Sequence, residues 1–460
     1  MTNSIVAALE GVISRLAALA DNPKINYQQL VIISTWLQTA FEVYIIRRQV
    51  PCYHRTEPPP ALKNHLSGET FKKAQVYSKD KTGFALSKLM FDQLLGWGLI
   101  KVGGYAGLWS FAGKVMNSVG LGQNRVITHS LLWMTLLTLS TSIPGLPWSY
   151  YQTFVLEQKH GFNKSTVKLW IMDTIKTYTL AAVIGLPVLA GFLRIIELAG
   201  KNFVPWLMLF LLGIQLSLQI VYPTFIQPLF NKLEPLPQGE LRTKVEELAS
   251  QLGFPLKHLY VIDGSKRSSH SNAYFYGLPW SKHIVIYDTL IKDSSVDEVV
   301  AVLGHELGHW YYAHPTKLLV ITQLHLLLTL TIFSIFIHNK ALYSSFGFDP
   351  SLAVTAPQPI CIGFMLFQLV LEPTDALVKF LLHAETRRME YQADEFAAEL
   401  DKKEDLKSAL IKLHITNLSS PHNDWLYSMY HHSHPTLPER LGAMDEWKGQ
   451  KRVLKGKKEL

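Results

Sequence analysis

The stretch Gly304-His305-Glu306-Leu307-Gly308-His309 lies inside Asp297–His314, a segment whose apolar residues follow a helical period and which Pro315 is expected to end. Residues four apart on a helix project from one face, so His305 and His309 should lie one turn apart with Glu306 between them. Two imidazoles placed in this way can reach one metal ion while the glutamate holds a water. The alternative is a polar helix end with incidental histidines.

The small number of cysteines restricts the rest of such a metal site. The chain has 460 residues but only Cys52 and Cys361, which excludes a disulfide scaffold and a Cys-rich zinc finger. A catalytic zinc uses three protein ligands and keeps one position open for water. Glu390 is the best candidate for the third ligand of a single zinc ion, and Asp394, one helical turn later, for a residue that orients a ligand imidazole. A solvated helix face is the alternative for this second motif.

The composition indicates a membrane protein. Charged residues make up 17% of the chain and hydrophobic residues 48%, whereas soluble domains carry about 25% charged residues. The apolar residues gather in runs of near-spanning length. We predict seven transmembrane helices, near 27–46, 89–111, 126–145, 169–192, 203–224, 317–338 and 358–382. Buried helices of a large soluble protein are the alternative.

The distribution of Lys and Arg predicts the orientation of these spans. The predicted loop 47–88 carries nine basic and three acidic residues, so we place it in the cytosol and the N-terminus on the opposite side. Alternation then puts 225–316 and everything after 383 in the cytosol.

Ionisable residues inside spans usually face a bundle interior or a wet cavity. The predicted spans contain Glu42, Asp173, Lys176, Glu372 and Asp375.

Two polar pieces complete the predicted organisation. The piece 225–316 has the pattern of a small α/β unit, with a helix at Gly239–Gly253 and strands at His258–Asp263, Asn272–Gly277 and His283–Asp288. The piece 383–460 is predicted to be helical with a basic tail. We therefore divide the chain into 1–224 with spans one to five, 225–316 as the first part of a domain that carries the metal motif, 317–382 with spans six and seven, and 383–460 as its second part. Two crossings return the chain to the same side, so the two parts can form one domain.

Beyond these motifs, the sequence resembles the gluzincin metallopeptidases and, among them, the type I CAAX prenyl proteases. The resemblance extends over essentially the whole chain. It rests on His305–His309 and Glu390–Asp394 together with the following stretches: Pro147–Tyr150, Phe154–Asn163, Tyr222–Lys232, Ser271–Phe275, His432–Pro435 and Glu439–Leu441.

The resemblance implies a fold, a reaction and a location. The fold would be mainly α, a seven-helix bundle enclosing a water-filled chamber, with a cytosolic-side gluzincin-like α/β zinc domain split around spans six and seven. The enzyme would remove the last three residues from prenylated CAAX proteins. An N-terminal cut in an a-factor-like pheromone precursor would depend on the organism. The protein would lie in the endoplasmic reticulum membrane, with the inner nuclear membrane as a second location.

The resemblance also assigns roles to individual residues. His305, His309 and Glu390 would hold zinc, and Glu306 would be the general base. His434 and Arg440 would assist at the oxyanion, and the segment Asn272, Ala273 and Tyr274 would bind the substrate as an edge strand. The residues themselves leave alternatives open. His434 belongs to a group of three close histidines that could simply decorate a loop, Arg440 could be a structural partner of Glu390 or Asp394, and Tyr274 could belong to an ordinary strand.

The net charge of +8 and the basic tail suggest two kinds of negatively charged partner, nucleic acid and a lipid surface. The excess charge is shared among membrane-proximal loops without a recognition motif, so we exclude nucleic acid and expect the lipid bilayer as partner. The last residues, Lys457-Lys458-Glu459-Leu460, fit a dilysine retrieval signal on a cytosolic tail.

Two other functions remain as alternatives. One is a membrane quality-control metallopeptidase acting on misfolded or translocon-jammed proteins. The other is a non-catalytic scaffold, which the intact metal motif argues against.

Overall fold

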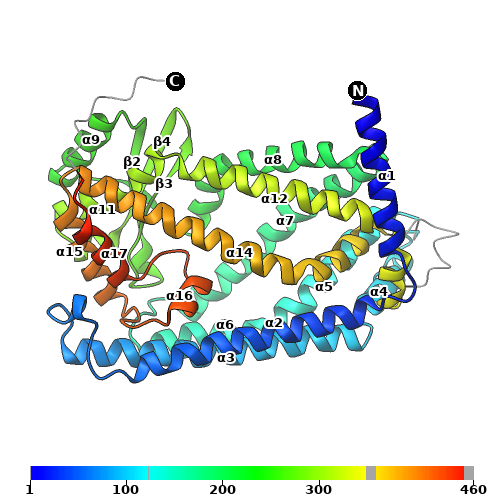
Figure 1. Ribbon diagram of the computed structural model, residues 1–460, viewed down its shortest axis with the longest axis horizontal. Helices are drawn as coiled ribbons and strands as arrows, with labels where there is room; N and C mark the ends of the chain where they lie inside the picture. Colours follow the sequence, from blue (N-terminus) through cyan, green and yellow to red (C-terminus); the bar gives the residue numbers. More distant parts are fainter. Residues whose placement is uncertain (1, 123, 349–358, 450–460) are drawn as a thin grey trace.

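A computed structural model describes residues 2–122, 124–348 and 359–449, so the predicted dilysine signal lies outside the described residues. The long helices run along the long axis of the molecule, with the sheet and several short helices at one end and α1 (Thr2–Ala20) at the other (Figure 1). The long helices are α2 (Tyr27–Gln49), α3 (Gly68–Lys101), α5 (Val126–Ser142), α7 (Val167–Ala199), α8 (Phe203–Val221), α12 (His314–Phe336) and α14 (Ile360–Glu399).

Five stretches of the described chain are long and apolar enough to cross a membrane: Tyr27–His54, Val126–Glu157, Val167–Leu229, His314–Phe336 and Ile360–Glu399. The third stretch contains both α7 and α8. Their outward side chains are apolar. Leu324 on α12 and Leu377 on α14, for example, are 61% and 60% exposed. Such large apolar surfaces require lipid rather than water, and the protein is therefore a multi-pass membrane protein.

The region before the second predicted span differs from the prediction. Residues 68–88, predicted as part of a loop, form the first half of α3. The charged residues that suggested a loop can lie on one face of a helix, so a charged segment can still be helical. The predicted span 89–111 is also broken. Gly103 takes a left-handed conformation with φ of 67° between α3 and α4 (Gly104–Ser118), a conformation that glycine adopts without strain.

The long helices share a buried apolar cluster at the end remote from the sheet. Trp133, Leu207, Phe333 and Phe367 are fully buried there in one apolar cluster. The five ionisable residues named above within the predicted spans each contact another element or line a cavity. Asp173 pairs with Arg267, Lys176 donates to the Leu229 carbonyl oxygen, Glu42 faces His431, Asp375 faces His325, and Glu372 lines a cavity of about 240 Å³.

At the opposite end lies a four-stranded sheet in the order β1-β2-β4-β3, formed by Leu233–Pro235, Leu256–Ile262, Ser281–Tyr287 and Ala273–Leu278. β2 and β4 are parallel, the other pairs are antiparallel, and β3 is an edge strand. The predicted strands match β2, β3 and β4 to within two residues, whereas the three-residue β1 was not predicted.

Helices that precede and follow the membrane-crossing stretches α12 and α14 in the chain lie at this end of the molecule. They are α9 (Glu240–Leu252), α10 (Asp288–Asp293), α11 (Val296–Tyr311), α15 (Lys403–Thr416), α16 (Trp425–His431) and α17 (Leu437–Glu446); α13 (Lys340–Ser345) lies between α12 and α14 in the chain. Ile286 of β4, Leu303 of α11, Phe396 of α14 and Leu441 of α17 belong to one buried core. The two polar pieces of the sequence therefore share a single apolar core.

The predicted end of the helix that carries His305 and His309 was also wrong. α11 ends at Tyr311, and His314 and Pro315 begin α12 instead of ending α11. Proline is well tolerated in the first turn of a helix, where its missing N–H has no intrahelical partner. The break between the two helices falls at Ala313, which has a φ of 54°.

Candidate metal centre and peptide-binding strand

The helix α11 is strongly fixed at its start. Ser295 and Glu298 form a reciprocal capping box there, and the Glu298 carboxylate accepts hydrogen bonds from Ser408 and Lys412 of α15 at 2.6 and 2.7 Å. Val299 and Leu303 are buried in the core below. This packing leaves His305 and His309 on the face of α11 that meets α14.

One glycine, Gly308, lets α11 and α14 approach closely. A Cβ atom on Gly308 would lie 3.1 Å from both Ala393 Cα and Phe396 Cβ, which is tighter than ordinary packing. On Gly304 it would lie 3.6 Å from the nearest atom, a methyl group of Leu400. The contact at Gly308 therefore sets the distance between the histidines on one helix and Glu390 on the other.

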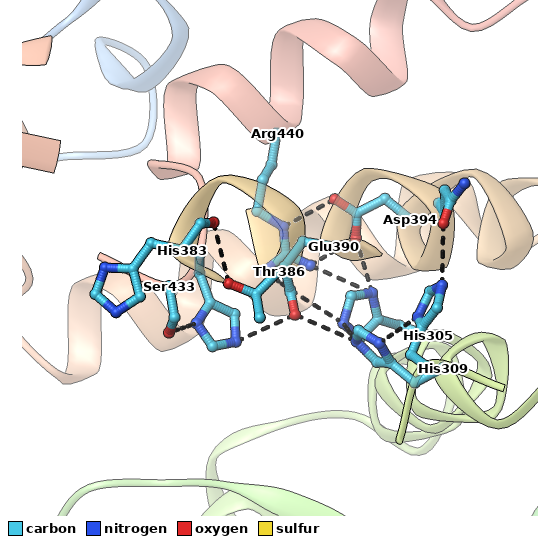
Figure 2. A network of polar contacts seen from close by, with 11 residues as sticks. His305, His309, His383, Thr386, Glu390, Asp394, Ser433 and Arg440 are labelled. Atoms are coloured by element: carbon cyan, nitrogen blue, oxygen red, sulfur yellow. Dashed lines mark hydrogen bonds and ion pairs between the residues drawn. The ribbon is translucent and has the colours of Figure 1, made fainter. Parts of the chain in front are cut away.

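His305, His309 and Glu390 form a compact cluster whose potential ligand atoms all lie within 4.8 Å of one another (Figure 2). His309 Nε2 lies 3.2 Å from His305 Nε2 and 3.2 Å from Glu390 Oε1. Glu390 Oε2 is buried and has no hydrogen-bond partner among the described residues. A buried carboxylate oxygen left in this state beside two imidazole nitrogens fits a metal ion, and two His with one Glu is a donor set of catalytic zinc sites.

Behind the cluster, Asp394 and Arg440 hold His305. His305 Nδ1 lies 2.9 Å from Asp394 Oδ1, and Arg440 Nε donates to Asp394 Oδ2 at 2.8 Å. Burial lowers the pKa of His305, but hydrogen bonds to Asp394 and Glu390 outweigh it and raise that pKa to about 9. Arg440 also comes within 3.6 Å of Glu390 Oε2. Asp394 thus occupies the position expected of a residue that orients a ligand imidazole.

Glu306 points into a cavity of about 720 Å³ that His309, Glu390 and His434 also line. Burial raises the pKa of the Glu306 carboxyl, against the lowering influence of charge on His305 and His309. A carboxylate with a raised pKa is a stronger base and is therefore better suited to accept a proton from water.

His434 reaches the cluster from the opposite side. Its Nε2 lies 3.2 Å from Glu390 Oε1, and its Nδ1 lies 2.9 Å from the Ser433 hydroxyl. The side chain is 63% exposed, so a bound molecule can reach it. Arg440, by contrast, is 8% exposed and turned toward Asp394 (Figure 2).

The edge strand β3 forms one wall of the same cavity through Tyr274, Phe275, Tyr276 and Gly277. Asn272 O accepts a hydrogen bond from Tyr287 N of β4 at 3.0 Å. Because antiparallel pairs alternate, the backbone groups of Ala273 and Phe275 then face away from β4. The Asn272 side chain already accepts the Ala273 N–H at 2.8 Å.

Tyr274 is held by the amide of Gln227, which follows α8. Burial raises the pKa of the Tyr274 hydroxyl to about 12, with Tyr287 and Tyr222 nearby adding to the effect, so the hydroxyl stays protonated. Of the segment predicted to bind substrate, Tyr274 lines the cavity, whereas Asn272 and Ala273 support the strand beside it.

The sequence analysis missed four residues of this region: Gln227, Phe275, His314 and Gln392. His314 was placed in the motif helix, although a third histidine close behind His309 was a signal that could have been followed. Gln392 stands between Glu390 and Asp394 in the same motif. Gln227 and Phe275 lie within two stretches that carry the family resemblance, Tyr222–Lys232 and Ser271–Phe275, but neither was given a role.

Comparison with known proteins agrees with this arrangement. Residues 49–232 match the family described as CAAX prenyl protease N-terminal, five membrane helices, and residues 235–448 match peptidase family M48. CAAX prenyl protease 1 of Saccharomyces cerevisiae is 41% identical over 94% of this chain and 98% of its own length. The human CAAX prenyl protease 1 homolog is 38% identical over 91% of this chain and 95% of its own length.

The crystal structure of S. mikatae Ste24p superimposes with a TM-score of 0.86 at 41% identity, covering 92% of this chain and all of that one. The similarity includes both the membrane helices and the domain that carries the cluster of His305, His309 and Glu390. The chain therefore belongs to peptidase family M48, within its CAAX prenyl protease 1 group of multi-pass membrane metalloendopeptidases.

Proposed function

We propose that this protein is a zinc-dependent endopeptidase that removes the last three residues from prenylated CAAX proteins. The observation that carries the proposal is the position of the cluster of His305, His309 and Glu390, which shares one cavity with Glu306 and the edge strand β3 at the end of a membrane bundle. The relatives are named for CAAX prenyl proteases. A prenyl chain anchors such a substrate in the bilayer at about 0.8 kcal/mol per buried methylene, so an enzyme within the membrane meets it directly.

The peptide would bind along the outer edge of β3. The outward carbonyl group of Ala273 and the outward N–H and carbonyl groups of Phe275 can hydrogen-bond an extended chain, since the Ala273 N–H is already bonded to the Asn272 side chain. Tyr274, held by Gln227, and His434 would border this chain on either side. Bound in this way, the peptide would lie along the wall that leads to Glu306.

Zinc held by His305, His309 and Glu390 would supply a Lewis acid for the scissile carbonyl and lower the pKa of the attacking water. Glu306 would take the proton from this water and pass it to the leaving amine. His434 would donate from Nε2 to the developing oxyanion, because the Ser433 hydroxyl can donate to its Nδ1. Arg440 would act through Asp394. Its ion pair would keep the Asp394 carboxylate ionised and placed to hydrogen-bond His305.

The remaining features of the proposal concern the membrane. We infer seven crossings, with the N-terminus lumenal and the two parts of the peptidase domain, 225–316 and 383–460, on the cytosolic side of the endoplasmic reticulum membrane. Three cavities of about 720, 620 and 900 Å³ adjoin one another. The first two share Ser433 and His434, and the last two share Tyr77, Lys81 and His270. This series supports an internal chamber between the helices and the zinc site.

The test is cleavage by the purified full-length protein. The wild-type protein should release the last three residues from a prenylated CAAX peptide, and Glu306→Gln should reduce this at least 100-fold while retaining zinc. The matched unprenylated peptide and a misfolded membrane protein separate the main proposal from quality-control proteolysis. Equal cleavage of prenylated and unprenylated peptides would remove the prenyl specificity. A pheromone precursor added to the same assay tests for the N-terminal cut.

A further inference from the structure

A third histidine lies directly behind the metal cluster. His314 is 1% exposed, and it opens α12 immediately after the break at Ala313. Its Nδ1 lies 2.9 Å from His309 Nδ1, and its Nε2 lies 3.0 Å from Gln392 Oε1 of α14. The side chains of Gln392 on α14, His314 on α12 and His309 on α11 thus form one line of hydrogen bonds. None of the roles proposed above uses His314 or Gln392.

The proton positions along this line follow from the Gln392 amide. Its oxygen can only accept, so His314 must carry its proton on Nε2 and leave Nδ1 as an acceptor. His309 must then donate from Nδ1, which leaves the lone pair of His309 Nε2 free toward Glu390 and the metal position. If the amide were reversed, every proton would shift and His309 Nε2 would be protonated, unable to bind a metal. The orientation with Gln392 Oε1 facing His314 is the one compatible with His309 as a ligand.

We propose that His314 and Gln392 are positioning residues that fix the tautomer and orientation of His309 for zinc, an inference that rests on the proposed function. Ligand histidines usually donate their second N–H to a carboxylate, a carbonyl or water. In this protein an imidazole and an amide serve that purpose, and both are uncharged.

The two ligand histidines are therefore held in different ways by one helix. α14 supplies Glu390 as a ligand, Asp394 as a charged partner of His305, and Gln392 as a neutral partner of His309 through His314. A carboxylate partner makes an imidazole more basic and a bound metal less electrophilic. The neutral line orients His309 without adding negative charge, so the metal keeps its ability to polarise the substrate carbonyl.

This asymmetry makes Gln392 the informative position. Gln392→Leu removes the acceptor and should weaken zinc affinity about 10-fold or more. Gln392→Glu replaces it by a charged acceptor and should tighten zinc binding while lowering kcat, with KM unchanged. A residue that merely fills space would not move affinity in opposite directions. Tyr391→Phe, the neighbouring half-buried residue outside the line, is the matched control.

The experiment measures zinc retained by the full-length protein in detergent during titration with a competing chelator, together with kcat and KM at saturating zinc. Affinities in the order Glu, wild type, Leu at position 392, with Tyr391→Phe equal to wild type, support the inference. Unchanged affinity in both Gln392 variants overturns the inference while leaving the zinc peptidase intact. A wild-type protein that binds no zinc overturns the proposed function, and the inference with it.

Discussion

Arg440 and Asp394 form a two-bond ion pair behind the metal cluster, in which Arg440 Nε and Nη2 each donate to one carboxylate oxygen. Asp394 is 1% exposed and Arg440 is 8% exposed. Because the pair is buried, removing one partner leaves the other charge without compensation, and this usually costs about 3–5 kcal/mol.

The first prediction follows from this pair. Arg440→Met should lower the thermal unfolding midpoint markedly and reduce zinc affinity, because the Asp394 carboxylate loses its partner and His305 loses a fixed acceptor. Arg388→Met, on the helix that carries Asp394, is the control, since Arg388 is 71% exposed and pairs only loosely with Glu385. Differential scanning fluorimetry compares the two. Equal midpoints would show that the ion pair adds no stability.

The second prediction uses the close approach of α11 and α14. Gly308→Ala would place a methyl group 3.1 Å from Ala393 Cα, so α14 must shift by some tenths of an ångström and carry Glu390 with it. We expect about a tenfold loss of cleavage rate. Gly304→Ala meets its nearest atom at 3.6 Å, so it should keep activity and gain about 0.5–1 kcal/mol from helix propensity. Equal activities of the two variants would contradict this account of the helix contact.

The third prediction concerns the outer edge of β3. Phe275 N–H faces away from β4, so Phe275→Pro should keep the sheet while removing a donor for the substrate backbone. Phe275→Ala removes the same ring but keeps the donor. We expect kcat/KM for the Pro variant to fall about tenfold below the Ala variant, the contribution of one hydrogen bond. If the two variants cleave equally well, the peptide does not bind along this edge at Phe275.

The fourth prediction is a pH dependence away from the metal cluster. Burial favours the neutral form of Glu298, but hydrogen bonds from Lys412 and Ser408 outweigh it and lower the Glu298 pKa to about 2, whereas an unfolded glutamate titrates near pH ~4.3. This carboxylate therefore stabilises the fold above about pH 4.3, and the stabilisation is lost as the pH falls toward 2. Glu298→Gln should lower the unfolding midpoint by about 3 °C at pH 7.

The same comparison at lower pH provides the check. The difference in unfolding midpoint between wild type and Glu298→Gln should persist from pH 7 to 5 and shrink between pH 4 and 2. Only the wild type has a carboxylate at position 298 that becomes protonated in this range. A difference independent of pH would mean that the Glu298→Gln substitution disturbs packing rather than charge.

The sequence predicted the elements whose signals are local. The pattern around His305 and His309 predicted a helix, and the segment 258–288 predicted three strands that match β2, β3 and β4 to within two residues. Pairing the histidines with Glu390 relied on chemistry, since a Cys-poor chain must complete a zinc site with His or a carboxylate. The structure brings these three residues together although 81 positions separate His309 from Glu390.

The contacts that were not predicted depend on tertiary packing. The pairing of His314 with Gln392 spans 78 positions and requires the break at Ala313, which has no sequence signal of its own. The length of α3 was missed because its first half is polar and packs beside α2 only in the folded protein. Pro315 was misread because a proline can open a helix as readily as it can end one.

The helix α14 has a consequence for the relation between the enzyme and its bilayer. Its 40 residues correspond to a rod of about 60 Å, roughly twice the thickness of the hydrocarbon core. The apolar half and the half that carries Glu390, Gln392 and Asp394 form one continuous helix, with Pro373 as the place where such a helix bends most readily. A change in tilt of the apolar half, imposed by a thicker or thinner bilayer, therefore reaches these three side chains only to the extent that the helix does not bend at Pro373 to absorb it.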